Sequence, residues 1–153
     1  MAEGRVRRPL LLVGAHGGAG VSTLVRLLAP AAVDLGAPRD WRHIANPGWQ
    51  PVGVVTGCTV AATGQAVYQV AAAERAGIAP RLLLVVGDGW PVPRAARARL
   101  RLLSARVGRI VRVPYVPAWR YVEQPDPAHL PRAVELALAA VRAAADGPPE
   151  QPQ

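Results

Sequence analysis

A glycine-rich segment, residues 14–23, restricts the fold of this chain more than any other feature. It reads Gly-Ala-His-Gly-Gly-Ala-Gly-Val-Ser-Thr and lies between an apolar run at residues 10–13 and a leucine-rich segment at residues 24–28. The apolar run predicts a buried strand, and the leucine spacing predicts one face of a helix. Glycines at a strand-to-helix turn let backbone N–H groups approach an anion, and the helix dipole favours negative charge there. The segment therefore predicts a phosphate-binding loop in an α/β fold.

This loop has the pattern of a Walker A motif without its lysine. A Walker A loop wraps a phosphate with backbone N–H groups, reaches the terminal phosphates with a lysine, and binds Mg²⁺ through a Ser/Thr hydroxyl. The hydroxyls of Ser22 and Thr23 are in place, but the lysine position is Val21. The 18 basic side chains of the chain are all arginine, so a coding bias alone would leave an arginine here. A valine side chain cannot bind a phosphate, so the chemistry of the loop has changed.

The loop resembles that of the MinD/ParA class of P-loop proteins, which reads roughly Lys-Gly-Gly-x-Gly-Lys-[Ser/Thr]-Thr and carries an additional signature lysine at its front. In this comparison the signature lysine corresponds to His16, the glycines to Gly17, Gly18 and Gly20, and the Walker lysine to Val21. The resemblance implies ATP or another nucleotide with Mg²⁺ as the cofactor. The loop residues that it implies for binding are Gly14, His16, Gly17, Gly18, Ala19, Gly20, Val21, Ser22 and Thr23, with Ser22 as the Mg²⁺ ligand.

Three later segments resemble further parts of MinD/ParA proteins. Residues 52–58 resemble the strand after Walker B, and residues 82–88 resemble the strand that ends in asparagine. Residues 109–115 resemble the strand that leads into the loop beside the nucleotide base. This resemblance places Asp88, Pro114 and Tyr115 beside the nucleotide. It also implies that the switch and Walker B segments have shrunk to residues 34–51. In an alternative alignment Asp88, which ends an apolar run, is itself the Walker B aspartate.

The glycine loop, together with Val-Pro-Tyr-Val-Pro-Ala-Trp-Arg at residues 113–120, is similar to an uncharacterised family of small ParA-related proteins on bacterial conjugative or integrative elements. This similarity implies a link to plasmid or conjugative DNA transfer, or to partition.

Two other interpretations of the glycines stay open. Gly14, Gly17 and Gly20 also fit the spacing of a dinucleotide-binding Rossmann turn, which needs a second strand ending in an acidic residue about twenty positions on. Asp34 comes too early for that role, and Asp40 follows no strand-like run. The third interpretation is a structural turn that binds nothing.

Strand-like and helix-like segments alternate along the chain. The expected strands are residues 10–13, 52–56, 82–86 and 109–113, and the expected helices are residues 20–29, 63–76, 93–106 and 126–145. The last helix is expected to have Asp126 as its N-cap and Pro127 at its first position. This alternation predicts an α/β three-layer sandwich with a mostly parallel sheet, and the resemblance implies a reduced P-loop NTPase-like form of it.

The carboxyl ends of the strands form the expected ligand edge. Polar and aromatic residues gather at or just past these ends: Thr56, Thr59, Asp88, Trp90, Tyr115 and Trp119.

Length and composition predict one domain at residues 1–146 and a disordered tail at residues 147–153. Cys58 is the only cysteine, so it is expected to be a small buried residue in a reducing compartment. We expect a cytoplasmic protein, since no segment has the length of a signal peptide's apolar region or a membrane span.

The formal net charge of +8 indicates a binding partner without naming it. Arg94, Arg97 and Arg101 lie at helical spacing and form a basic face. This face could bind the DNA backbone, or it is simply a solvated helix surface, and a protein partner is the remaining candidate.

The missing lysines bear directly on catalysis. Phosphoryl transfer depends on positioning and on neutralising the developing charge, so this loop is expected to bind a nucleotide or phosphate with weak or no hydrolysis. By loop proximity, Arg26, Arg94 and Arg120 are candidates to replace the lysine. The sequence thus leaves three functions open: a degenerate ParA/MinD-like nucleotide-binding protein, a pseudo-NTPase interaction module that binds no nucleotide, and a Rossmann-type dinucleotide binder.

Overall fold

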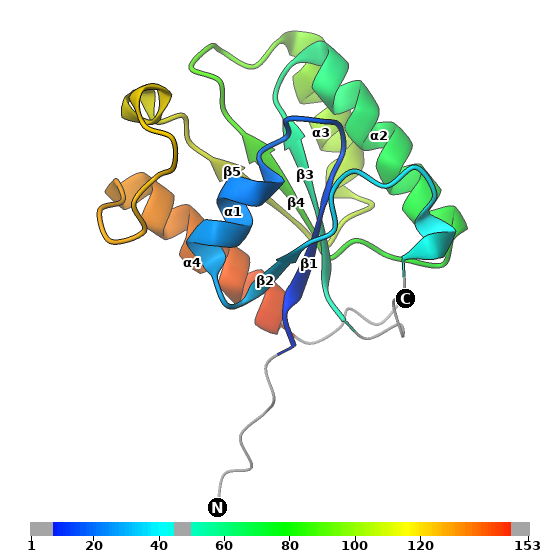
Figure 1. Cartoon of the computed structure of the whole chain (residues 1–153). Coiled ribbons are helices and arrows are strands. Elements are labelled where there is room, and N and C mark those ends of the chain that lie inside the picture. Colours follow the sequence, from blue (N-terminus) through cyan, green and yellow to red (C-terminus); the bar gives the residue numbers. More distant parts are fainter. Residues whose placement is uncertain (1–7, 45–49, 148–153) are drawn as a thin grey trace, which may run out of the picture.

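The computed structural model describes residues 8–44 and 50–147, which form a parallel sheet between two layers of helices (Figure 1). The strands are β1 (Leu10–Gly14), β2 (Ala32–Asp34), β3 (Val52–Gly57), β4 (Leu82–Val86) and β5 (Arg109–Val113). The α-helices are α1 (Val21–Leu28), α2 (Val60–Arg75), α3 (Arg94–Ser104) and α4 (Arg132–Asp146). Two short 3₁₀ helices, η1 (Trp41–His43) and η2 (Pro117–Tyr121), complete the described elements.

The sheet has the order β2-β1-β3-β4-β5, and every neighbouring pair is parallel. The predicted α/β sandwich is confirmed, and so is the position of β1 next to the centre of the sheet. The chain leaves β1 toward one edge to form β2 and then returns to the other side of β1 as β3. Ligands of doubly wound sheets bind outside the carboxyl ends of the strands at such a reversal point.

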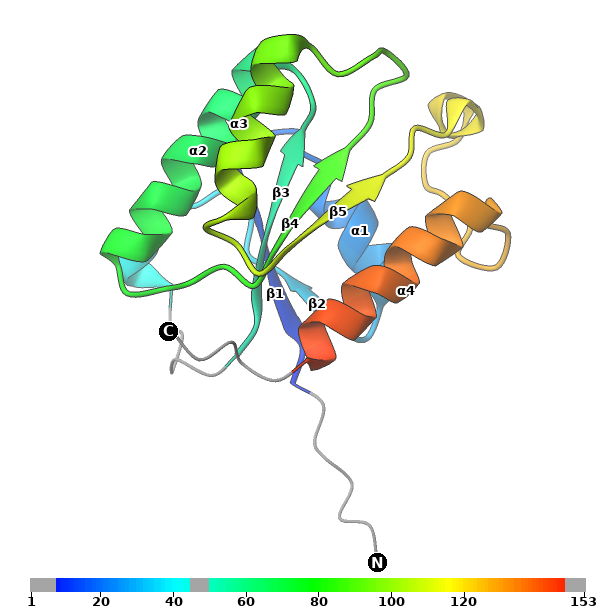
Figure 2. The same cartoon turned by 180° about the vertical axis from the view of Figure 1, so that it is seen from behind.

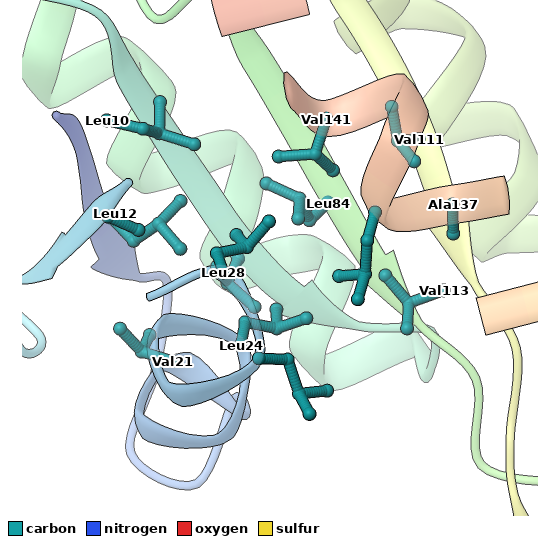
Figure 3. Close-up of a cluster of buried hydrophobic side chains, with 14 of the residues drawn as sticks. Leu10, Leu12, Val21, Leu24, Leu28, Leu84, Val111, Val113, Ala137 and Val141 are labelled. Carbon is teal, nitrogen blue, oxygen red and sulfur yellow. The ribbon is translucent and has the colours of Figure 1, made fainter. Parts of the chain in front are cut away.

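Each face of the sheet is covered by its own pair of helices, α1 and α4 on one side and α2 and α3 on the other (Figures 1 and 2). Alternate residues of each strand point to opposite faces. Leu12 and Leu84 therefore pack under α1 and α4, where Figure 3 shows them with Leu28 and Val141, while Leu83 lies in the cluster under α2 and α3. Strands buried on both faces are typical of parallel sheets, which explains the uninterrupted apolar run of β4.

The expectation of four strands was wrong because it missed β2. This strand has only three residues and pairs only with β1, through Leu10 with Ala32 and Leu12 with Asp34. Val33 and Asp34 are exposed, so the segment has no apolar periodicity by which to recognise it.

The expected start of the last helix was also wrong. α4 begins at Arg132, after Pro131, and not at Asp126. A helix begun at Asp126 would hold Pro131 in its interior, where the missing N–H and the ring break the hydrogen-bond ladder. Asp126 instead accepts a hydrogen bond from the backbone N–H of Ala128 at 2.9 Å, in a local turn.

α2 begins three residues before its expected start, because the Thr59 hydroxyl caps it by accepting from the N–H of Ala62 at 3.0 Å. The expected tail lies outside the described residues, apart from Gly147. Within residues 8–44 and 50–147, no helix is long and apolar enough to cross a membrane.

Candidate functional site

The glycine loop between β1 and α1 borders a cavity of about 410 Å³ at the carboxyl edge of the sheet. The residues around this cavity come from the end of β1, the loop, the first turn of α1, the end of β2 and the segment that follows β2: Gly14, His16, Gly17, Gly18, Ala19, Gly20, Val21, Ser22, Thr23, Asp34, Gly36 and Ala37. The structure therefore brings together all nine loop residues that the sequence singled out. It adds three residues from the segment after α1.

The start of α1 leaves backbone donors free for an anion. Gly20 precedes the helix with a φ of 102°, a left-handed conformation that only glycine adopts at little cost, and it has no side chain to cap the helix. The first hydrogen bond within the helix runs from the N–H of Leu24 to the carbonyl oxygen of Gly20 at 3.1 Å. The N–H groups of Val21, Ser22 and Thr23 thus have no acceptor inside the helix. Free N–H groups and the positive end of the helix dipole together favour a phosphate at this point.

A hydroxyl and a carboxylate that border the cavity contact each other. The Oγ of Ser22 donates to Oδ2 of Asp34 at 3.2 Å, and both residues are exposed. The other carboxylate oxygen, Oδ1, accepts from the N–H of Gly36 at 2.7 Å, and the carbonyl oxygen of Gly36 accepts from the N–H of Gly14 at 2.8 Å. Asp34 is therefore held at the end of β2 by the same segment that contacts the start of the glycine loop.

This pair suits a magnesium ion only if a phosphate supplies further ligands. Mg²⁺ prefers oxygen ligands, and it is usually bound by one or two carboxylates together with substrate phosphates and water. No group of three or more His, Cys, Asp or Glu side chains in the described part of the chain could hold a metal ion. The ion would therefore bind with the phosphate, held by Ser22 and Asp34.

His16 links the glycine loop to the next strand. Its Nε2 accepts a hydrogen bond from the N–H of Gly57, the last residue of β3, at 3.1 Å. The proton of the neutral ring then lies on Nδ1, which donates to the carbonyl oxygen of Gly17 at 2.9 Å. Both ring nitrogens of His16 are therefore used in hydrogen bonds that fix the conformation of the glycine loop.

Val21 belongs to the hydrophobic core. Only 8% of the residue is exposed, and its side chain packs in the cluster under α1 that Figure 3 shows. A Cβ atom on Gly14 would lie 3.2 Å from Cγ2 of Val21, so this position of the loop is fitted to glycine. No lysine or arginine is among the described residues that border the cavity.

A protein-family model described as "Family of unknown function (DUF6668)" matches residues 8–138 of the chain. The chain belongs to this family. The range matched by the DUF6668 model includes the glycine loop, Asp34 and all five strands. The chain matches no curated protein and no solved structure.

Three residues singled out from the sequence of this DUF6668 member, Asp88, Pro114 and Tyr115, are not among those that border the cavity. β3 separates β4, which precedes Asp88, from β1, which leads into the glycine loop. The Asp88 carboxylate accepts from the N–H of Trp90 at 3.0 Å, and this hydrogen bond, followed by one from Cys58, lowers the pKa of Asp88. Asp88 thus shapes its own loop, which packs on Tyr115: a Cβ atom on Gly89 would lie 2.9 Å from the tyrosine ring.

Other polar residues at the carboxyl edge have structural roles. Thr56 is fully buried and donates to the carbonyl oxygen of Ala62 at 3.0 Å, while Thr59 caps α2. Cys58 is buried, as expected, and burial together with hydrogen bonding to Asp88 raises the pKa of its thiol. Arg26, which hydrogen-bonds to Gln124, does not border the cavity.

Asp34 is the main site residue that the sequence interpretation missed. Its position 20 residues after Gly14 was taken as too early for a ribose-binding carboxylate, and no strand was expected before it. The available signal was local: the short apolar pair Ala32 and Val33, followed by an aspartate and then Gly36. Such a short edge strand becomes visible only through its pairing with β1.

Proposed function

We propose that this protein binds the phosphates of a nucleotide, ATP or a related one, together with Mg²⁺ at residues 14–23, with weak or no hydrolysis. The observation that carries the proposal is the Ser22–Asp34 contact of 3.2 Å, between two residues that border the cavity of the glycine loop. It sets a hydroxyl and a carboxylate beside the free N–H groups at the start of α1. In P-loop NTPases Mg²⁺ is held by the Ser/Thr of the loop and by the Walker B aspartate.

The strand order supports this assignment. β2 lies directly beside the strand that leads into the glycine loop, and Asp34 is its last residue. In the comparison with the MinD/ParA class, Asp34 takes the place of the Walker B aspartate, and β3, β4 and β5 follow in the order expected from the sequence. The shortened switch and Walker B region then begins at β2, and Asp88 has no role as a metal ligand.

Asp34 also makes the proposed binding depend on a cation. A carboxylate about 4 Å from a phosphate charge is repelled by about 4 kcal/mol at an effective dielectric constant of 20. The helix start attracts the phosphate, but no cationic side chain among the described residues around the cavity offsets this repulsion. A divalent ion between Asp34 and the phosphate turns the repulsion into attraction.

The lack of a positively charged side chain at the cavity is also the reason to expect weak hydrolysis of the nucleotide. Removing one preorganised donor to the developing charge of a transition state costs about 100- to 1,000-fold in rate. Here the Walker lysine is Val21, and the signature lysine is a histidine whose two nitrogens are already hydrogen-bonded. We infer that the nucleotide acts as a bound ligand and not as a rapidly consumed substrate. The similarity to small ParA-related proteins of mobile elements would place this ligand-bound form near DNA transfer or partition.

Titration calorimetry with ATP, in Mg²⁺ and in EDTA, tests the proposal. Binding is expected in Mg²⁺ only, and Ser22→Ala and Asp34→Asn are expected to weaken it. Asp40→Asn is the matched control, because Asp40 is a carboxylate outside the cavity that pairs with Arg42. Equal affinity with and without Mg²⁺ would contradict the metal role. Rapid Mg²⁺-dependent ATP turnover that Ser22→Ala abolishes would contradict the degenerate site.

A metal-free nucleotide site is the second candidate. The sheet order is also that of flavodoxin-like doubly wound folds, which bind a mononucleotide at the point of chain reversal, and Rossmann folds place an acidic residue at the end of their second strand. In this alternative, Asp34 would accept a hydrogen bond from a ribose hydroxyl. Titration with NAD and FMN in EDTA separates the two, because this candidate requires binding there. A protein that binds none of these ligands would be the interaction module that the sequence left open.

A further inference from the structure

The net charge of the protein comes from one continuous segment. Residues 89–122 contain eight arginines and no aspartate or glutamate, whereas the remaining ten arginines equal the ten acidic residues in number. This segment forms α3, β5 and η2. None of these eight arginines borders the cavity of the glycine loop.

Two of these arginines contact α2, and they therefore identify the side of α3 that faces α2. Arg99 donates to the carbonyl oxygen of Val60 in α2, and Arg106, just after α3, pairs with Glu74 of α2. At 100° per residue, Arg97 and Arg101 lie on the opposite side of the helix from these contacts. Both are exposed, and Figure 2 shows β5 on that side of α3.

β5 presents an unpaired edge beside these arginines. It is the last strand in the sheet order, so its far side has no partner strand in the described chain. The N–H of Arg109 and the carbonyl oxygen of Val113 bond toward β4. Because backbone groups alternate in direction along a strand, those of Ile110 and Arg112 point outward.

The side chains of this edge continue the basic surface. Ile110 packs against the core cluster under α2 and α3, so Arg112, two residues on, lies on the same face of the sheet. Arg112 is exposed, and so is Arg109, which by the same alternation lies on the other face of the sheet. We define the β5 edge surface as the outward backbone of Ile110 and Arg112 with the exposed arginines on the α3 side of it, which are Arg97, Arg101 and Arg112.

We propose that the β5 edge surface binds an extended acidic segment of a partner protein, which adds to the sheet as a sixth strand. Strand addition uses backbone hydrogen bonds for affinity and alternate side chains for specificity. Acidic side chains at alternate positions of the added strand would meet Arg112 and the arginines of α3. Like charge opposes pairing of this edge with a second copy of the chain, as charged residues commonly do at exposed edges.

A nucleic acid is the competing partner, since arginines on a helix face also fit phosphates. Two features favour the acidic segment. A nucleic acid leaves the outward N–H and carbonyl groups of Ile110 and Arg112 unused, whereas an added strand pairs them. The arginines also lie on both the helix and the strand, so they flank the path of an added chain.

The direct test is amide hydrogen exchange of the full-length protein with a synthetic hexapeptide that alternates glutamate and valine, at low ionic strength. Exchange at the amides of Ile110 and Arg112 is expected to slow on binding. The Val111 amide, which points toward β4, is expected to stay protected throughout. The control peptides alternate lysine with valine, or glutamate with proline, and neither is expected to bind as a strand.

Two variants at one position separate charge from backbone pairing. Arg112→Gln removes the charge, and Arg112→Pro removes both the charge and the outward N–H, a change that an edge strand tolerates. Arg112→Pro is expected to weaken peptide binding about three- to tenfold more than Arg112→Gln, as loss of one hydrogen bond implies. If Arg112→Pro fails to fold, the exchange experiment on the unaltered protein decides alone.

Unchanged exchange at Ile110 and Arg112 under saturating peptide would overturn the proposal. A second result would show that the surface binds the phosphates of a nucleic acid. In that case duplex DNA would bind more tightly than the peptide at equal ionic strength, and exchange at these two amides would again stay unchanged. Neither result bears on nucleotide binding at residues 14–23, so the two proposals fail separately.

Discussion

Restoring a lysine at Val21 should strengthen nucleotide binding and lower stability. The Val21 residue is 8% exposed and packs under α1, beside Leu24 and Leu28 (Figure 3). In Val21→Lys the aliphatic stem keeps part of this contact, while the ammonium group must reach the cavity that the residue borders. Burial of a valine side chain contributes about 1.5 kcal/mol or more, so we expect a loss of about 1 kcal/mol in the free energy of unfolding.

The gain at the site should exceed this loss. A hydrogen bond to a charged group contributes about 1.5–3 kcal/mol, which corresponds to about a ten- to 150-fold increase in affinity. The lysine also supplies the positive charge that the described residues around the cavity lack. The midpoint of thermal unfolding should fall by about 2–4 °C for each kcal/mol lost.

Calorimetry with ATP and Mg²⁺ measures the affinity, and thermal unfolding measures the stability. Val21→Met is the matched control, because it has a similar unbranched stem and no charge. If both variants bind ATP as the original protein does, the cavity does not bind the terminal phosphates and the reasoning fails.

Three further predictions concern the loop, the surface and the core. His16→Ala should lower the free energy of unfolding by about 1–3 kcal/mol in denaturant titrations, because it leaves a backbone N–H of β3 without its acceptor; an unchanged midpoint would show that water replaces the ring. The pKa of Asp40 is lowered to about 2, first by the side-chain hydrogen bond from Arg42, so this pairing favours the folded state above about pH 4 and is lost as the pH falls through 2. In an NMR titration Arg42→Gln should return the Asp40 pKa toward 3.8, and no shift would refute the pairing. Leu84→Ala removes a fully buried side chain in the middle of β4 and should cost about 2–5 kcal/mol by calorimetric unfolding, whereas a cost below 1 kcal/mol would mean that the core collapses around the gap.

The sequence predicted elements whose signal is local. β4 and β5 have the predicted bounds, because a continuous apolar run and an alternating run between turns are each recognisable without the rest of the fold. The glycine loop was also recognised locally, since its glycines, hydroxyls and following leucines lie within fifteen residues. In both cases the determining interactions lie within the segment itself.

The elements that were missed depend on contacts between distant segments. β2 is short, two of its three residues are exposed, and it exists because β1 offers its backbone on that side. Asp34 becomes a site residue only when β2 brings it to the first turn of α1, twelve residues back along the chain. The start of α4 was misplaced for a different reason, because the capping signal of Asp126 was given more weight than the helix-breaking effect of Pro131.

The measurement that tests the account most directly is a crystal structure of the protein with a non-hydrolysable ATP analogue and Mg²⁺. We expect the terminal phosphates at the N–H groups of Val21, Ser22 and Thr23, with the ion bound by the Ser22 hydroxyl and the Asp34 carboxylate. The hydrogen bond of 3.2 Å between these two side chains should be replaced by their contacts with the ion. Crystals that show no phosphate near residues 17–23 at saturating nucleotide, or a phosphate there with Asp34 turned away and no metal, would contradict the proposed site.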